Sequence, residues 1–152
     1  MAADEAETMH QAELGVTQIS EVVQNNSCGR GWNTYGPLWI WAESVYGVGY
    51  GEVYWKTRQP IDVTSFARIC FDMKYSIYLG QDKWRTWLQV GIYRESDDTG
   101  KFWSLEGVDR SGDGVISVDI RNYTGNYTPE IGVFSASAGV RTSMEVRSIW
   151  FE

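Results

Sequence analysis

Apolar and polar residues alternate along most of the chain after residue 32. In RICFDMKYSI (68–77), for example, Ile69, Phe71 and Met73 share one parity, whereas Asp72 and Lys74 share the other. Successive side chains of a β-strand point to opposite faces, so this period of two predicts half-buried strands. The same alternation marks the segments GEVYWKT (51–57), KWRTWLQVGIY (83–93), KFWSLEGV (101–108), VISVDIRNY (115–123), EIGVFSAS (130–137) and TSMEVRSIWFE (142–152).

Polar turn clusters separate these segments: SDDTG (96–100), RSGDG (110–114) and YTGNYTP (123–129). Short strands at regular spacing, joined by polar turns, are typical of an antiparallel sandwich or barrel. We therefore expect residues 26–152 to form an all-β domain, an antiparallel two-sheet β-sandwich of the jelly-roll type.

The first 25 residues follow a different pattern. Apolar residues recur there at steps of three and four, as in the a/d seam of a heptad repeat. The seam consists of Met9, Ala12, Val16, Ile19 and Val23. It predicts a short N-terminal helix within residues 1–25, the end of a coiled-coil stalk that joins chains into a homo-oligomer, with a homotrimer as the favoured state. Because so short a helix is marginal alone, a helix packed on the domain and a disordered leader remain alternatives.

Composition and charge narrow the classes of partner. The 152 residues include eight Trp, nine Tyr and five Phe but only three Pro, which favours β structure. A formal net charge of −7, without a cluster of Lys and Arg among the aromatic residues, argues against nucleic acid. No run of about 18 apolar residues occurs, so membrane insertion is not expected. The acidic start MAADEAETMHQ does not resemble a signal peptide, so either the chain is not secreted by that route or it was excised from a longer one.

Few residues could support catalysis or metal binding. His10 is the only histidine and precedes the predicted sandwich, which excludes a histidine-based nucleophile. Cys28 and Cys70 are too far apart in sequence for a CxxC motif, and whether they pair is left open. Glu43 and Glu52 are candidates for the carboxylate pair of a glycoside hydrolase, although solvated strand residues explain them more simply.

The segment DRSGDG (109–114) resembles the opening of a calcium loop. Asp109, Ser111 and Asp113 stand at alternate positions, but Ile120 occupies the twelfth position, where an EF-hand requires Glu. A β-turn explains the same residues, because Gly supplies positive φ and Asp bonds its own backbone. We expect a hairpin turn, no cofactor, and structural calcium at Asp109 and Asp113 only as the weaker alternative.

The aromatic-rich segment GPLWIWAESVYGVGYGEVYW (36–55) is the most unusual part of the chain. Sugars present apolar C–H faces edged by hydroxyls, and exposed flat rings beside polar side chains hold such ligands in water. Trp39 and Trp41 fall on one face of a strand, opposite Leu38 and Ile40. If the aliphatic face is core, the two indoles form a platform for a ligand; otherwise they are themselves core.

A second aromatic group shares its parity with polar residues. Trp87 and Tyr93 alternate in phase with Arg85 and Gln89, which predicts an exposed ligand-contact surface, against the alternative of a covered sheet edge or a subunit interface. Three other tryptophans alternate in phase with aliphatic residues, and we expect them in the core: Trp55, Trp84 and Trp150.

Three segments carry a resemblance to a known group of domains: VYWKTRQPIDVTSFARICFDMKYS (53–76), GVISVDIRNYTGNYTPEIGVFS (114–135) and the terminal MEVRSIWFE (144–152). Their order resembles that in carbohydrate-binding-module-like jelly rolls at the C-termini of phage tail and minor structural proteins and in surface proteins of Firmicutes. The resemblance implies a β-sandwich and suggests glycan binding or virion attachment. The density of Trp between Trp32 and Trp55 departs from that pattern, so the binding surface is not carried over from it.

These observations favour a non-catalytic glycan-binding module that binds a polysaccharide or cell-surface glycan, as in the receptor-binding domain of a phage tail or fibre. The corresponding location is the virion tail or the bacterial cell surface, outside the cell. A structural virion or surface assembly domain without sugar binding is the first alternative, and a small glycoside hydrolase is the second.

Overall fold

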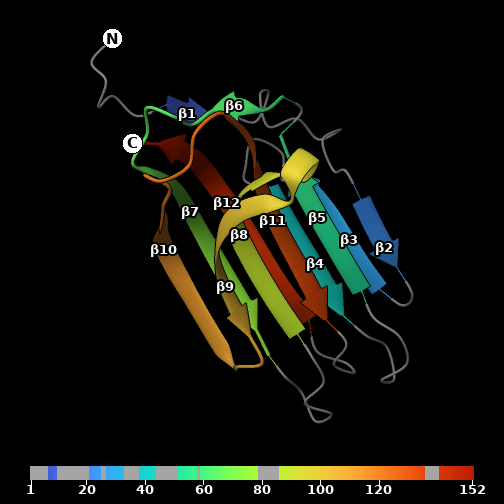
Figure 1. The fold of residues 1–152 in the computed structure, drawn as a ribbon. Coiled ribbons are helices and arrows are strands. Elements are labelled where there is room, and N and C mark those ends of the chain that lie inside the picture. Colours follow the sequence, from blue (N-terminus) through green and yellow to red (C-terminus); the bar gives the residue numbers. More distant parts are fainter. Residues whose placement is uncertain are drawn as a thin grey trace.

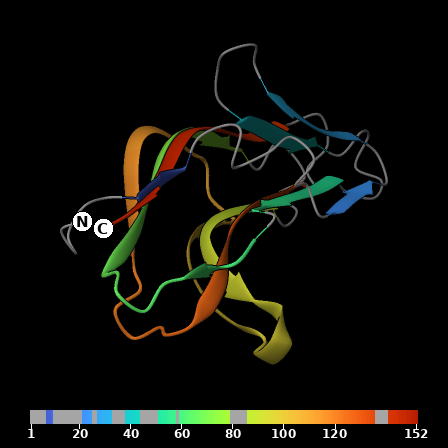
Figure 2. The same ribbon diagram turned by 90° about the horizontal axis from the view of Figure 1, so that it is seen from above.

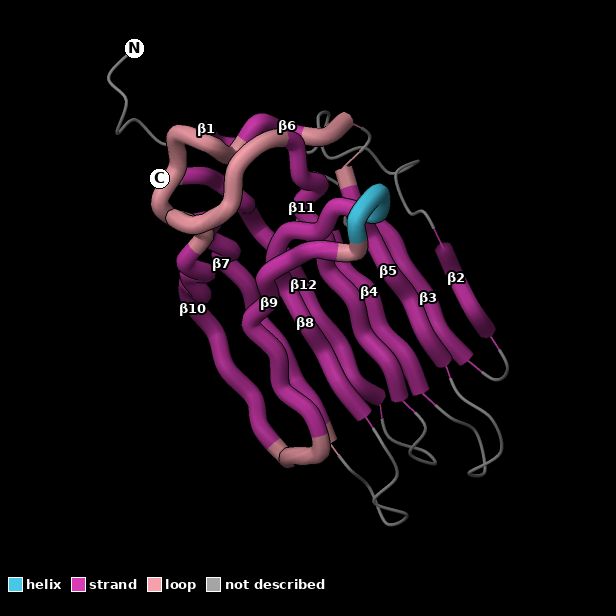
Figure 3. Tube along the Cα trace, in the orientation of Figure 1, coloured by secondary structure: helices cyan, strands magenta, loops and turns pink. Residues whose placement is uncertain are grey.

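The computed structural model describes residues 7–9, 21–24, 27–32, 38–43, 51–57, 59–78, 86–135 and 141–152. Two six-stranded antiparallel sheets lie face to face, which confirms the predicted β-sandwich (Figures 1 and 2). The helical structure in the described residues is a 3₁₀ turn, Glu95–Asp97, between two strands (Figure 3).

One sheet, here called sheet A, has the strand order β10-β7-β12-β4-β3. Its members are β10 (Arg110–Asp119), β7 (Arg68–Ile77), β12 (Arg141–Phe151), β4 (Leu38–Glu43) and β3 (Ser27–Trp32). The short strand β1 (Glu7–Met9) pairs with the last residues of β12, beyond the part that pairs with β4.

The other sheet, sheet B, has the order β2-β5-β11-β8-β9. Its members are β2 (Glu21–Gln24), β5 (Gly51–Lys56), β11 (Asn126–Ser135), β8 (Thr86–Arg94) and β9 (Thr99–Glu106). The two-residue strand β6 (Ile61–Asp62) pairs with the start of β11.

The core lies between the two sheets and contains the aliphatic residues that the alternation in the sequence predicts to point inward. In β7, Ile69, Phe71 and Met73 are fully buried, and in β8 so are Leu88 and Val90. Each such side chain contributes about 1.5–3 kcal/mol on burial. Most residues of the opposite parity lie partly or fully exposed on the outer face of each sheet, whereas Cys70 and Gly91 are buried there.

The three tryptophans predicted to be core differ in outcome. Trp55 is fully buried, as expected, and Trp84 lies outside the described residues. The prediction for Trp150 is wrong, because its side chain is only half-buried. A bulge between Val146 and Ser148 shifts the register of β12 against β7, which moves Trp150 to the outer face.

The prediction of a hairpin turn at 109–114 is also wrong, because residues 110–114 belong to β10. The turn lies just before them, where Gly107 has φ 66°. Gly112 is opposite Tyr75 in β7, and a Cβ at this position would overlap the Tyr75 hydroxyl. Asp113 forms an ion pair with Arg147, which lowers the pKa of the carboxyl. Within the described residues, no group of three acidic, His or Cys side chains is placed to hold a metal ion.

Two motifs of the sequence resemblance meet in space and have a structural role. The Asp62 carboxylate accepts hydrogen bonds from the Thr64 amide at 3.0 Å and from its hydroxyl at 2.6 Å. The Thr64 hydroxyl in turn accepts one from the Gly125 amide at 2.8 Å. Hydrogen bonds between the segments PIDVTS and YTGN therefore connect β6 to the turn before β11. The role of these two motifs is to stabilise the fold.

The structure places parts of the predicted N-terminal helix in strands. Met9 pairs with Ile149 in sheet A, and Val23 pairs with Glu52 in sheet B. Pairing in these strands satisfies backbone N–H and C=O groups at the edges of the two sheets. A short helix that packs against nothing would leave those edge groups unpaired and is marginal by itself. Ala12, Val16 and Ile19 lie outside the described residues, so the stalk and the boundary at residue 25 stay predictions.

Two further predictions concern cysteine and the membrane. Cys70 is a free, buried thiol whose Sγ lies 3.4 Å from the Ser117 hydroxyl. Burial raises the pKa of this thiol. Among the described residues, no helix has the length and apolar character needed to cross a bilayer.

Candidate functional site

The structure divides the predicted ligand-contact residues between two surfaces. Trp87, Gln89 and Tyr93 lie together on β8 in sheet B. Trp39 and Trp41 lie on β4 in sheet A. Because the two sheets share one core, their outer faces point in opposite directions (Figure 2). Arg85 lies outside the described residues.

Strand register builds the outer face of sheet B from residues distant in sequence. Directly paired residues of antiparallel strands point to the same face. Gly132 of β11 lies between Tyr54 of β5 and Gln89 of β8. The neighbouring rows have the same construction, with Phe134 between Glu52 and Trp87, and Glu130 between Lys56 and Gly91.

An aromatic cluster covers one end of this face. The Trp87 and Phe134 rings are stacked with centroids 5.7 Å apart, and Tyr54 is tilted against Trp87 at the same distance. A Cβ at Gly132 would lie only 2.8 Å from the Tyr54 ring, so glycine is what allows the rings to close over the strand. Trp87 is half-buried while Leu88 and Val90 are fully buried, which is the burial pattern expected for this strand.

Beside this cluster the outer face of sheet B is hollowed. The hollow has a volume of about 390 Å³ and is named here the sheet B groove. Its lining combines three rings with five hydrogen-bonding side chains: Tyr54, Tyr93, Phe102, Glu52, Lys56, Gln89, Glu95 and Glu130. The Tyr54 hydroxyl donates a hydrogen bond to the Glu52 carboxylate. The groove is thus bordered by flat apolar surfaces and rich in oxygen acceptors.

Tyr93 is held in place at the end of the groove. Its hydroxyl donates a hydrogen bond of 2.6 Å to the carboxylate of Asp98. The Asp98 backbone adopts the left-handed conformation, with φ 53°. Arg94 bonds Asp97 at 2.6 Å and lies 4.4 Å from the Tyr127 ring centroid, which fixes the turn that carries Asp98. The bond to Asp98, with the charge of that carboxylate, raises the pKa of the Tyr93 phenol to about 12.

We expect this tyrosine to ionise later than an ordinary one. The ultraviolet difference titration of wild type minus Tyr93→Phe should show one phenol with a pKa of about 12, against about 10 for an exposed tyrosine. Asp98→Asn should return that phenol toward its usual range. Because the folded pKa is the higher one, the interaction stabilises the fold below about pH 10 and is lost as pH rises toward 12. A difference titration centred near pH 10 would contradict the Tyr93–Asp98 bond.

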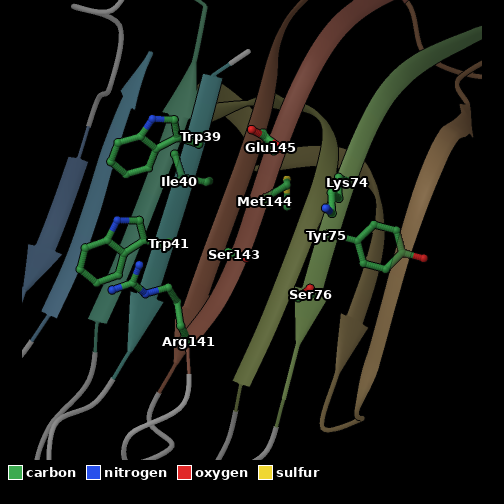
Figure 4. A pocket seen from close by; sticks show the side chains of 10 residues that line it. All are labelled: Trp39, Ile40, Trp41, Lys74, Tyr75, Ser76, Arg141, Ser143, Met144 and Glu145. Carbon is green, nitrogen blue, oxygen red and sulfur yellow. The ribbon is translucent and has the colours of Figure 1, made fainter. Parts of the chain in front are cut away.

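The outer face of sheet A carries a second aromatic surface. Ile40 and Ala42 are fully buried, so the aliphatic side of β4 is core and the two indoles point outward, half-buried. A hollow of about 260 Å³ borders them (Figure 4). The Arg141 guanidinium lies 3.9 Å from the centre of the Trp41 ring.

Sequence reasoning missed several residues of both surfaces. Strand parity places Tyr54 outward, but only the pairing of β5 with β11 and of β11 with β8 brings it beside Trp87. Phe102 shares its parity with Ser104 and Glu106, which is an outward signal, but only the pairing of β9 with β8 brings its ring beside Tyr93. The contact between Arg141 and Trp41 joins strands almost 100 residues apart in sequence. A single sequence encodes no signal for these pairings.

Comparison with known proteins identifies the fold. No family model and no curated protein matches the sequence. Among solved structures, the xylan-binding module CBM86 of the gut symbiont Roseburia intestinalis is 12% identical, with a TM-score of 0.53 over 97% of this chain and 95% of that one. The family 11 carbohydrate-binding module of Clostridium thermocellum, solved with a β-1,3-1,4-mixed-linked tetrasaccharide, is 10% identical, with a TM-score of 0.53 over 96% and 94%.

A third similar structure is that of a larger protein, PfGH50B. It is 12% identical and has a TM-score of 0.51, and the match covers 90% of this chain but 22% of PfGH50B. At these identities the likeness concerns the fold. This chain therefore has the β-sandwich architecture of carbohydrate-binding modules.

Proposed function

We propose that this chain is a non-catalytic glycan-binding module whose ligand lies in the sheet B groove. The observation that carries the proposal is the lining of the groove, in which three rings alternate with carboxylate, amide and ammonium groups on a rigid sheet. Rings of this kind stack on the apolar faces of sugars, and the polar groups bond the hydroxyls at their edges.

The charges of the groove favour a neutral glycan. Among the described residues that line the groove, Glu52, Glu95 and Glu130 contribute three carboxylates against the ammonium of Lys56. Carboxylates accept strong hydrogen bonds from hydroxyls but repel a polyanion, and the whole chain carries a net charge of −7. The similar structures of a xylan-binding module and of a module with a mixed-linked glucan tetrasaccharide support this choice of ligand class.

Binding is expected with neutral plant polysaccharides. Affinity electrophoresis in gels containing xylan or mixed-linkage β-glucan should retard the wild type, and Tyr93→Ala should weaken binding about tenfold, since it removes one ring and costs about 1.4 kcal/mol. Tyr78→Ala is the matched control, because Tyr78 is 44% exposed and lies outside the groove.

Incubation of the protein with xylan or mixed-linkage β-glucan should release no reducing sugar. Release that disappears in Glu52→Gln would show that the groove is catalytic and would contradict the non-catalytic part of the proposal. Binding that is equal in wild type and Tyr93→Ala would move the ligand away from the groove.

The biological setting is a further part of the proposal. The resemblance to phage tail and Firmicutes surface domains supports attachment to a cell-surface glycan, in a virion tail or on a bacterial surface. In that setting, the support for a homotrimer is the spacing of Ala12, Val16 and Ile19, because Met9 and Val23 of the predicted seam pair in β-strands.

A further inference from the structure

We propose that the outer face of sheet A is a second glycan-contact site, centred on Trp39, so that one chain can hold two polysaccharide segments on opposite sides of the sandwich. The inference rests on the proposed function for the class of ligand. It goes beyond it in assigning a separate site and a bivalent mode of binding.

The neighbouring strand β3 adds no side chain beside the two half-buried indoles. Trp39 and Trp41 are two residues apart on β4, which spaces them by about 7 Å along the strand. On β3, the directly paired residues are Gly31 and Gly29, which have no side chain to cover the indoles. The Trp39 side chain is half-buried, so part of its surface remains exposed.

The other side of the indoles is polar. On β12, Glu145 pairs with Trp39 and Ser143 pairs with Trp41. Further across the sheet, Lys74 pairs with Glu145 and Ser76 pairs with Ser143. Together with the indoles these four side chains line the hollow of about 260 Å³ and supply both donors and acceptors (Figure 4). A ligand with many hydroxyls matches such a mixed lining.

Arg141 adds a fixed donor. Its guanidinium lies 3.9 Å from the centre of the Trp41 ring, an attractive contact between a cation and the face of an aromatic ring. Trp41 thus positions the Arg141 N–H groups beside the hollow, while Trp39 provides the stacking surface. The two indoles have different tasks.

The charges at this surface favour a glycan over a second protein chain. Cores of protein interfaces are depleted of Lys and Glu, yet Lys74 and Glu145 both line the hollow. The hollow is also smaller than the pockets of about 300–1,000 Å³ that enclose drug-sized ligands. It therefore suits a short segment of a long polysaccharide that continues beyond it.

Bivalency makes a distinct prediction. Wild type should cross-link soluble mixed-linkage β-glucan or xylan, with turbidity that peaks at an intermediate protein ratio. Trp39→Ala should reduce this turbidity to the level that the sheet B grooves alone support in the oligomeric state measured by light scattering, and weaken binding to insoluble polysaccharide by tenfold or more through lost avidity. It should still bind a short oligosaccharide through the sheet B groove. Ser76→Arg, which fills the hollow without removing a ring, should act in the same way.

The outcomes separate this inference from the proposed function. Absence of wild-type binding to any glycan overturns both. Wild-type binding with unchanged turbidity and avidity in Trp39→Ala and Ser76→Arg overturns only the second site, whereas Tyr78→Ala should leave every readout unchanged. Light scattering decides the remaining case: a wild-type oligomer that dissociates in Ser76→Arg would make this face an interface between copies and overturn the inference.

Discussion

Replacing Trp55 with alanine should lower the free energy of unfolding by about 3–5 kcal/mol, the range for removal of a fully buried Trp or Phe. The side chain is 0% exposed, and its strand neighbour across sheet B is Ile131, also fully buried. Tyr54 and Lys56, the sequence neighbours of Trp55, point to the outer face and line the sheet B groove. The same change should therefore loosen one wall of that groove. Urea unfolding measures the loss of stability, and glycan affinity measured well below the new midpoint isolates the effect on the groove.

Trp55→Phe is the matched control. The Trp55 Nε1 group is buried and has no hydrogen-bond partner among the described residues, and such a donor costs about 1–3 kcal/mol. Phenylalanine keeps most of the ring and removes this donor, so the loss of stability should be much smaller than that for alanine. Equal losses in both variants would show that Trp55 does not stabilise the fold through the volume it fills.

The fold was accessible from sequence because burial on one face imposes a strict period of two. The predicted inward residues of β7 and β8 are confirmed as buried, from Ile69 to Met73 and from Leu88 to Ile92, although Cys70 and Gly91 of the opposite parity are buried as well. The errors arise where a neighbouring strand decides the outcome. The parity of Trp150 depends on a bulge in the pairing of β12 with β7, and residues 110–114 extend as a strand because β7 offers a pairing edge.

From the sequence, the outward residues of the candidate site could be predicted only within each strand separately. Parity grouped Trp87 with Gln89 and Tyr93, and Trp39 with Trp41, but it did not show that the two groups lie on different sheets. The partners of each group come from long-range register, as with Phe134 opposite Trp87. Glycine contributes as much as the aromatic residues, because rings lie flat only over positions without a Cβ, and no local pattern reveals which glycine will lie beneath a ring.

Gly91 is the position at which this requirement is strictest. Gly91 lies opposite Phe102 on the outer face of sheet B. A Cβ there would overlap the carbonyl oxygen of Lys101 and lie 2.8 Å from both the Cα and the ring of Phe102. Since backbone cannot turn aside as a side chain can, Gly91→Ala should force β8 and β9 apart. We expect a loss of about 3 kcal/mol, the upper end for overpacking, together with weakened glycan binding as Phe102 leaves the groove.

Gly112→Ala tests whether backbone overlap is the cause. A Cβ at Gly112 would meet only side-chain atoms, the hydroxyl and outer ring atoms of the half-buried Tyr75, and no backbone atom. Gly112 lies on β10 of sheet A, so this variant also leaves the sheet B groove intact. Its loss of stability should therefore be clearly smaller than that of Gly91→Ala, and the affinity of its sheet B groove for a short oligosaccharide should equal that of wild type. If Gly91→Ala unfolds at the same urea concentration as wild type, β9 does not pack against β8 in the register described, and Phe102 cannot border the groove.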